Sequence, residues 1–290
     1  YNLTKFLCNS NEFKDSFILG LDNFDPYYDI NIKKNNIQNL KKLKNFSFFC
    51  EDIRNTNIIN IEKPDIIVHL AGLAGVRNSI QMPQSYSDVN INGMINLLEQ
   101  SKNNNVKRFL FASSSSVYGS NSSLPFNENH DLDNIISPYA LSKKVMEDYG
   151  KLYSKMYNMN IIGFRFFTVY GPGGRPDMAP YKFIFNIKNN IEINKFGKGD
   201  SMRDYTYIDD IVYGIIGGIK NNIAGFNIFN LGNSKPVTLN IFIELCEKVC
   251  NKKAKINQLD IQMGDVFFTY ADITKSKKYL GYEPKVTLEE

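Results

Sequence analysis

The chain has 290 residues, of which 43% are hydrophobic, and it carries a formal net charge of +4. This length and apolar content exclude a short peptide module and are enough for one large domain or two intertwined ones. The lysines are scattered among asparagines, as is typical of a solvated surface, so we expect no nucleic-acid partner.

The cysteines and histidines argue against a metal site and an oxidising compartment. Four cysteines form no C-x-x-C pair, and the two histidines are too few for a usual metal cluster, so we expect no metal. Cys246 and Cys250 lie four residues apart, on one face of a predicted helix, where small buried side chains are expected. With no signal-peptide pattern and no apolar run of the roughly 18 residues that span a membrane, we expect a reduced, cytoplasmic protein.

Along the chain, residues 1–7 have the pattern of a helix. Short apolar runs then alternate with helical patterns, and the runs cover residues 17–21, 46–49, 65–70, 108–112 and 161–166. Continuous apolar strands separated by helices of ten or more residues indicate a parallel sheet covered on both faces. We therefore predict an α/β fold with a doubly wound parallel sheet, whose ligands bind at the carboxyl ends of the strands.

The pattern changes after Tyr170. Glycines and prolines fill residues 171–177, and the helices and short strands that follow do not alternate regularly. Residues 207–218 and 226–231 again have the pattern of a helix and then a strand, which predicts one return to the sheet. The sequence thus predicts a larger domain of residues 1–169 and 207–232 and a smaller lobe of residues 170–206 and 233–290.

A polar run follows the strand predicted at 108–112. Its residues are Ser113-Ser114-Ser115-Ser116-Val117-Tyr118-Gly119. Serines after a strand often form only a turn with their hydroxyls satisfied locally. At this position in a parallel sheet they can instead donate hydrogen bonds to a substrate oxygen.

A tyrosine and a lysine lie four residues apart in Tyr139-Ala140-Leu141-Ser142-Lys143, on one face of a predicted helix. A neighbouring ammonium lowers the pKa of a phenol from its ordinary value near 10, which would make Tyr139 a general acid and base. This spacing alone also occurs on many amphipathic helices.

Together, these motifs resemble the extended short-chain dehydrogenase/reductases that epimerise or dehydrate nucleotide sugars. The resemblance rests on Val68-His69-Leu70-Ala71-Gly72, the serine run, the Tyr139/Lys143 pair and Arg203-Asp204-Tyr205 with the residues to Asp210, in that order. Within the family, residues 166–172 and 174–179 are most similar to those of UDP-glucuronate 4-epimerases, and so is the opening at 21–29. The likeness covers essentially the whole chain.

The resemblance implies a Rossmann-like NAD-binding domain and a UDP-sugar lobe, with NAD as the cofactor. Its catalytic residues would be Ser114, Tyr139 as the base, and Lys143 as activator and ribose ligand. The residues that the resemblance places at the cofactor are Asp22, Asn23, Asp52, Ile53, Leu70, Ala71, Gly72, Asn90, Tyr139, Lys143 and Phe166.

For the substrate, the resemblance implies contacts from Ser115 and Ser116, from Arg203 at the diphosphate, and from Asp265 near uridine. Arg203 and Asp265 have an alternative interpretation as ordinary surface charges. It also implies a homodimer.

One expected motif is missing. The family begins with a strand and a glycine-rich turn that binds the pyrophosphate, whereas residues 1–7 already resemble the helix that follows this turn. We interpret this as truncation, with natural loss as the alternative.

The expected reaction is NAD-dependent 4-epimerisation of a UDP-sugar, most like UDP-glucuronate to UDP-galacturonate, through a 4-keto intermediate. This intermediate is a β-keto acid that can lose carbon dioxide, so its carboxylate must be held. Thr168 and Arg175 are the candidates, because a guanidinium can bind a carboxylate at two points, although Arg175 could also pair with Asp177 or face solvent. The alternatives are a 4-epimerase for UDP-glucose/UDP-galactose or N-acetylated sugars, and a non-catalytic ligand-binding homologue.

Overall fold

The computed structural model describes residues 1–261 and 266–290 of the protein. At its centre is a four-stranded parallel sheet with strand order β10-β5-β4-β3, and β1 and β2 form a separate parallel pair. The strands of these two sheets are β1 (Ile18–Leu21), β2 (Phe46–Phe49), β3 (Ile66–His69), β4 (Arg108–Ser114), β5 (Ile161–Phe166) and β10 (Phe226–Leu231).

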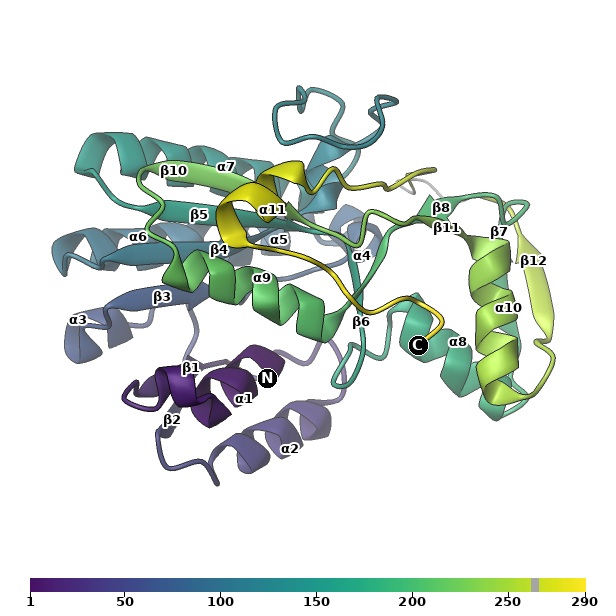
Figure 1. The fold of residues 1–290 in the computed structure, drawn as a ribbon, viewed down its shortest axis with the longest axis horizontal. Helices are drawn as coiled ribbons and strands as arrows, with labels where there is room; N and C mark the ends of the chain where they lie inside the picture. The colour runs from purple at the N-terminus through teal and green to yellow at the C-terminus, as the bar shows by residue number, and fades with distance from the viewer. Residues whose placement is uncertain (262–265) are drawn as a thin grey trace.

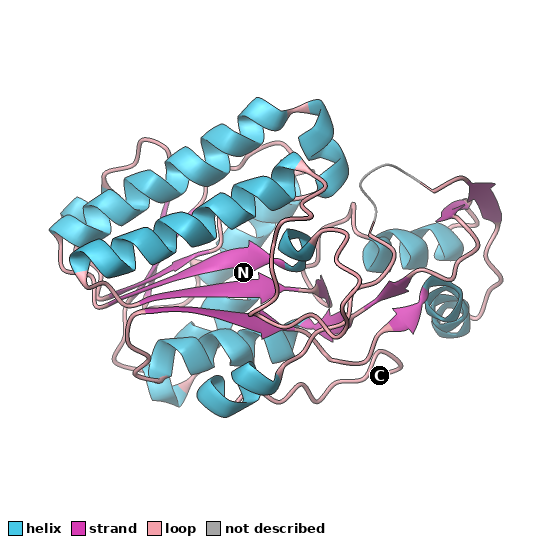
Figure 2. Ribbon diagram, turned by 90° about the horizontal axis from the view of Figure 1, so that it is seen from above, coloured by secondary structure: helices cyan, strands magenta, loops and turns pink. Residues whose placement is uncertain are grey.

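Helices cover both faces of the four-stranded sheet (Figures 1 and 2). On one face α7 contacts β4, β5 and β10 and packs against α6, while α9 contacts β4 and β5 on the other face and packs against α1 and α11. The helices of this part are α1 (Asn2–Asn9), α2 (Ile30–Leu40), α3 (Ile58–Glu62), α4 (Val76–Gln81), α5 (Pro83–Tyr86), α6 (Gly93–Asn103), α7 (Pro138–Tyr157), α9 (Ile208–Lys220) and α11 (Thr274–Leu280), with the short helical turns η1 (Asn11–Phe13), η2 (Ser87–Asn92) and η3 (Ser115–Tyr118).

The apolar run of β4 explains why the sheet is buried on both faces. Phe109, Leu110 and Phe111 are each fully buried. Leu110 packs into the core beneath α9, whereas Phe109 and Phe111 pack into the core beneath α7, because successive side chains of a strand point to opposite faces. A strand buried on both faces has no polar alternation, so the sequence pattern correctly predicted a doubly wound α/β fold.

The smaller lobe lies beyond the carboxyl ends of the central strands (Figure 1). Its core contains Phe183 and Ile187 of α8 together with Phe242, Ile243 and Cys246 of α10. Its elements, with the short strands that lead into it, are β6 (Thr168–Tyr170), α8 (Ala179–Lys188), β7 (Ile193–Phe196), β8 (Met202–Arg203), β9 (Tyr205–Tyr207), β11 (Val237–Thr238), α10 (Leu239–Cys250) and β12 (Ile256–Leu259).

Most predicted strands match the observed ones within a residue, but β4 is longer than its apolar run. Ser113 and Ser114 continue the strand and pair with Arg165 and Phe166 of β5.

The domain boundaries stay a prediction, and α11 packs on α9 and β10 of the central sheet rather than on the smaller lobe. Among the described residues, no helix is both long and apolar enough to cross a membrane.

Asp204, which lies between β8 and β9, connects the smaller lobe to the end of the sheet. Its carboxylate is fully buried and accepts hydrogen bonds from the backbone N–H groups of Asn233, Ser234 and Ala271, at 2.7, 3.0 and 3.0 Å. Burial raises the pKa of Asp204 to about 6, against the effect of these three donors.

We expect Asp204→Asn to lower the free energy of unfolding by about 1–3 kcal/mol, because an amide NH₂ would face buried N–H donors and leave at least one unpaired. Urea denaturation measures the change. Asp200→Asn, at an exposed aspartate of the same segment, is the control and should change stability little. Equal stability of the two variants would contradict the role given to Asp204.

Candidate active site

A cavity of about 1110 Å³ opens between the carboxyl ends of the central strands and the smaller lobe. This is the position at which parallel sheets bind ligands, and the volume slightly exceeds the usual range for ligand pockets. The sequence-predicted residues that line it are Asp22, Asn23, Ile53, Leu70, Ala71, Gly72, Ser114, Ser115, Ser116, Tyr139, Lys143, Phe166, Thr168, Arg175 and Arg203.

The first two turns of α7 place Tyr139 and Lys143 in this cavity. The helix begins at Pro138 because the Ser137 hydroxyl caps it by accepting a hydrogen bond from the Ala140 N–H at 3.1 Å, and proline suits the first helical position. Lys143 is buried, with 4% of its surface exposed, and its Nζ donates to the Ala112 carbonyl at 2.8 Å. Burial lowers the pKa of Lys143 to about 8, against the opposing effect of Glu147.

The expected effect of Lys143 on Tyr139 is not observed. Burial raises the pKa of Tyr139 above its ordinary value, and a hydrogen bond with Ser114 and the charge of Arg175 only partly offset burial. The ammonium of Lys143 is turned to a backbone carbonyl, so the four-residue spacing alone does not produce an activated phenol.

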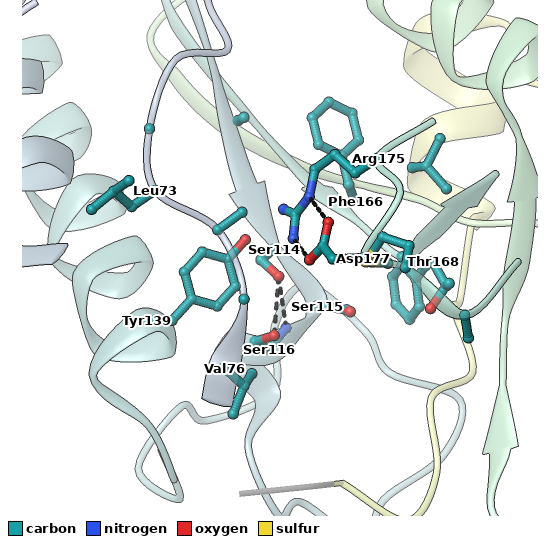
Figure 3. Close-up of a pocket in the computed structure, with 18 of the residues that line it drawn as sticks. Leu73, Val76, Ser114, Ser115, Ser116, Tyr139, Phe166, Thr168, Arg175 and Asp177 are labelled. Carbon is teal, nitrogen blue, oxygen red and sulfur yellow. Dashed lines mark hydrogen bonds and ion pairs between the residues drawn. The ribbon is translucent and has the colours of Figure 1, made fainter. Parts of the chain in front are cut away.

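The serine run brings hydroxyls to the phenol. Ser114 ends β4 and caps η3, where its Oγ accepts from the Ser116 N–H at 3.1 Å and lies 3.2 Å from the Ser116 Oγ. Ser115 and Ser116 follow it into the cavity wall. In Figure 3 the Tyr139 hydroxyl points toward Ser114. The local turn and the contact with Tyr139 therefore occur together.

At the other end of the cavity, Asp22 and Asn23 follow β1. The Asp22 carboxylate accepts from the Phe24 N–H at 2.7 Å, and Lys33 approaches it at 3.9 Å. Asp52, which is expected to contact the cofactor, is not among the residues that line the cavity, and its cofactor contact stays a prediction. Its carboxylate accepts from Asn23 at 2.9 Å and pairs with Arg54, whose hydrogen bonds lower the pKa of Asp52 strongly.

Asn90 also lies behind the cavity wall rather than in it. It is fully buried in η2, where its Oδ1 accepts from the Leu73 N–H at 2.8 Å and its Nδ2 donates to the Leu73 carbonyl and the Ser142 hydroxyl. Gly72, at φ 153°, packs so tightly that a Cβ would lie 2.8 Å from the Asn90 Oδ1. Asn90 thus holds the loop of Leu70, Ala71 and Gly72 in place.

The residues expected to bind substrate lie at the entrance to the smaller lobe. Thr168 begins β6 and is held there by its N–H bond to the Asp204 carbonyl at 3.0 Å. Arg203, on β8, donates from Nη1 to the carbonyls of Met202 and Phe267. Asp265, expected near uridine, lies outside the described residues.

Arg175 pairs with Asp177, which is the alternative left open by the sequence. The guanidinium Nε and Nη2 donate to the two carboxylate oxygens at 3.0 and 2.5 Å (Figure 3). The guanidinium also lies over the ring of Tyr27, 5.0 Å from its centroid, with Nη2 3.5 Å from the Tyr27 hydroxyl. Arg175 remains close enough to Tyr139 to affect its pKa.

Tyr27 and Arg77 are among the cavity residues that the sequence did not indicate, and Asp177 was expected only as an alternative partner of Arg175. Arg77 lies in the first turn of α4 and stacks over Phe196 of β7, which connects the larger domain to the smaller lobe. Its position seven residues after Leu70, at the end of a predicted strand, is a signal that could have identified it. Tyr27 and Asp177 are 150 residues apart, and no local pattern indicates their contact.

A sequence model of the GDP-mannose 4,6 dehydratase family matches residues 19–290. The chain is 44% identical to an uncharacterized protein of Methanocaldococcus jannaschii, over 100% of this chain and 89% of that protein. It is 42% identical to a UDP-glucuronate 4-epimerase of Thermodesulfobacterium geofontis, over 94% and 85%. The structure is similar to that of UDP-glucuronic acid 4-epimerase from Bacillus cereus in complex with UDP-glucuronic acid and NAD, with a TM-score of 0.93 and 34% identity over 99% and 91% of the two chains.

Proposed function

This chain belongs to the extended short-chain dehydrogenase/reductase family, and we propose that it is an NAD-dependent isomerase that converts UDP-glucuronate to UDP-galacturonate. The reaction inverts C4 of the sugar through a 4-keto intermediate. The observation that carries this proposal is the presence in one cavity of Tyr139, bonded to Ser114, and of Arg175, close enough to influence the phenol.

The residues present fit NAD. Gly72 leaves no room for a Cβ beside Asn90, so the loop of residues 70–72 offers backbone to the cavity. At one end, the Asp22 carboxylate can accept from ribose hydroxyls, and at the other the Lys143 ammonium can donate to them. Bound NAD supplies a hydride acceptor for C4 and a positive charge.

Tyr139 removes the proton of the C4 hydroxyl as the hydride leaves C4. It returns this proton after the keto sugar has rotated in the cavity and presents its other face. Burial favours the neutral phenol, so the hydrogen bond from Ser114 and the charges of Arg175 and Lys143 must support the phenolate during the reaction. At pH 7 a lysine with a pKa of about 8 is mainly protonated and can supply one of these charges.

The hydroxyls of Ser115, Ser116 and Thr168 and the guanidinium of Arg175 hold the sugar carboxylate. A 4-keto uronate loses carbon dioxide when the bond to its carboxylate carbon is aligned with the π orbitals of the C4 carbonyl. Binding the carboxylate at several points prevents this alignment and so protects the intermediate. Arg175 suits this role because its planar fork binds a carboxylate at two points, as it already does with Asp177.

A panel of UDP-sugars tests the proposal. The kcat/KM for UDP-glucuronate should exceed that for UDP-glucose and UDP-N-acetylglucosamine, with UDP-galacturonate as the product. A preference for a neutral hexose would support the second candidate, a 4-epimerase of neutral UDP-sugars, for which the Arg175–Asp177 pair would remain closed. Failure to convert any of them, or to bind NAD, would leave a non-catalytic homologue.

We further propose that the protein is a homodimer that pairs through α7. Its outer face has an apolar stripe of Leu141, Val145, Leu152 and Met156, which recurs at helical spacing and is exposed or half-buried. A stripe on one helix can pair with its own copy around a twofold axis.

A cytoplasmic location is proposed as well, because the four cysteines, all within the described residues, are free thiols.

Light scattering tests the dimer. We expect Leu152→Arg to shift the protein from dimer to monomer, because two guanidinium groups would meet in an apolar contact. The control is Val249→Arg on α10, at a residue that is 65% exposed and far from α7 in the chain, and it should stay dimeric. A dimeric Leu152→Arg variant or a monomeric unmodified protein would each refute the α7 interface.

A further inference from the structure

The guanidinium fork of Arg175 already holds a carboxylate that belongs to the protein. Both oxygens of Asp177 accept from it, through Nε at 3.0 Å and Nη2 at 2.5 Å. This two-point arrangement is the one that a uronate carboxylate would adopt on the same fork. The two side chains lie two residues apart in the loop before α8, and both line the cavity.

Tyr27 fixes the plane of this pair. The Arg175 guanidinium lies over its ring, and the Tyr27 hydroxyl is 3.5 Å from both the Arg175 Nη2 and an Asp177 oxygen. Burial alone would raise the pKa of Asp177, but its hydrogen bonds and the charge of Arg175 outweigh burial and hold the pKa below the ordinary value. Asp177 is therefore ionised at neutral pH.

Asp177 is the more accessible partner, with 39% of its side chain exposed against 26% for Arg175. Of the two, the carboxylate can move toward solvent more readily, because the guanidinium is stacked on Tyr27. An incoming carboxylate would also repel it, since two like charges cannot share one fork edge.

We propose that Asp177 is an internal competitor that occupies the Arg175 fork until a uronate carboxylate displaces it, and that takes the fork back when the product leaves. This inference rests on the proposed function of Arg175. A neutral hexose offers no charged group in exchange, so it leaves the Arg175–Asp177 pair closed. Asp177 thus weakens the binding of substrate and product and keeps a partly buried guanidinium paired between turnovers.

Equilibrium binding of UDP-glucuronate and UDP-glucose to Asp177→Asn tests this competition. Both titrations use the NAD-loaded protein carrying Tyr139→Phe, so that the sugar is not converted. Because asparagine is neutral, it leaves the Arg175 fork free for the substrate. We therefore expect the Kd for UDP-glucuronate to fall about three- to tenfold. This change corresponds to a free energy between the contribution of an exposed ion pair and that of a charged hydrogen bond. The Kd for UDP-glucose should change less than about twofold.

Two control variants separate competition from general charge effects. Asp200→Asn removes another carboxylate that lines the cavity, and it should affect both UDP-sugars equally, since both carry a diphosphate. Asp177→Glu keeps a carboxylate within reach of Arg175 and should retain most of the competition.

Failure of the Asp177 competition and failure of the uronate role of Arg175 give different binding results. Unchanged or weaker binding of UDP-glucuronate by Asp177→Asn would mean that Asp177 only orients Arg175, and it would overturn the inference. If Arg175→Ala in the same background bound UDP-glucuronate as tightly as the protein with Arg175 intact, the uronate role of Arg175 would fail instead. Thermal unfolding of each variant verifies that it is folded, which a half-exposed loop position should allow.

Discussion

Tyr139→Phe is expected to lower the turnover of UDP-glucuronate by about a hundredfold or more, the contribution of a general acid and base, while the substrate still binds. The substitution removes only the hydroxyl that hydrogen-bonds with Ser114 and keeps the ring that packs edge-on against Tyr86, with centroids 6.1 Å apart. Steady-state kinetics and a binding titration together measure the two effects.

Tyr149→Phe is the matched control. Tyr149 lies on the same helix, packs against the core beneath α7 and does not line the cavity. It should leave turnover close to that of the unmodified protein. If Tyr139→Phe turned over as fast as this control, Tyr139 could not be the group that moves the C4 proton.

Arg175→Ala is expected to impair UDP-glucuronate conversion about ten- to a hundredfold. The substrate carboxylate would lose a charge-assisted partner whose contribution is about 1.5–3 kcal/mol. Conversion of a neutral UDP-hexose should fall much less, and some decarboxylated pentose product should be released, because the keto acid is no longer held. Product analysis by chromatography measures both changes.

Arg175→Lys keeps the charge but lacks the planar fork, so it should lie between the alanine variant and the unmodified protein. Equal losses on UDP-glucuronate and UDP-glucose would leave Arg175 with a structural role. The assignment would then reduce to a 4-epimerase of unspecified UDP-sugars.

The sequence was sufficient where the controlling interactions are local. A strand buried on both faces must be apolar throughout, so the run containing Phe109 and Phe111 revealed its place in the sheet. Tyr139 and Lys143 reach the cavity because of helical spacing and the Ser137-Pro138 cap, which are also local. The position of these residues at the end of the sheet follows from the parallel topology.

The sequence was insufficient where contacts join distant residues. The Tyr27 contact with Arg175 spans 148 positions, and Asn90 turned inward to a loop 17 residues away. The pKa of Tyr139 depends on how deeply the phenol is buried, and the spacing of residues in the sequence does not reveal the depth of burial. The choice of Arg175 between Asp177 and a ligand depends on side-chain geometry in three dimensions.

In the proposed reaction, hydride leaves C4 of a uronate and returns to the same carbon. UDP-glucuronate with deuterium at C4, incubated with the NAD-loaded protein in ordinary water, tests it most directly by NMR of the product. We expect UDP-galacturonate that retains the deuterium at C4, because the transferred hydride never exchanges with solvent. UDP-galacturonate with hydrogen at C4, or no UDP-galacturonate at all, would contradict it.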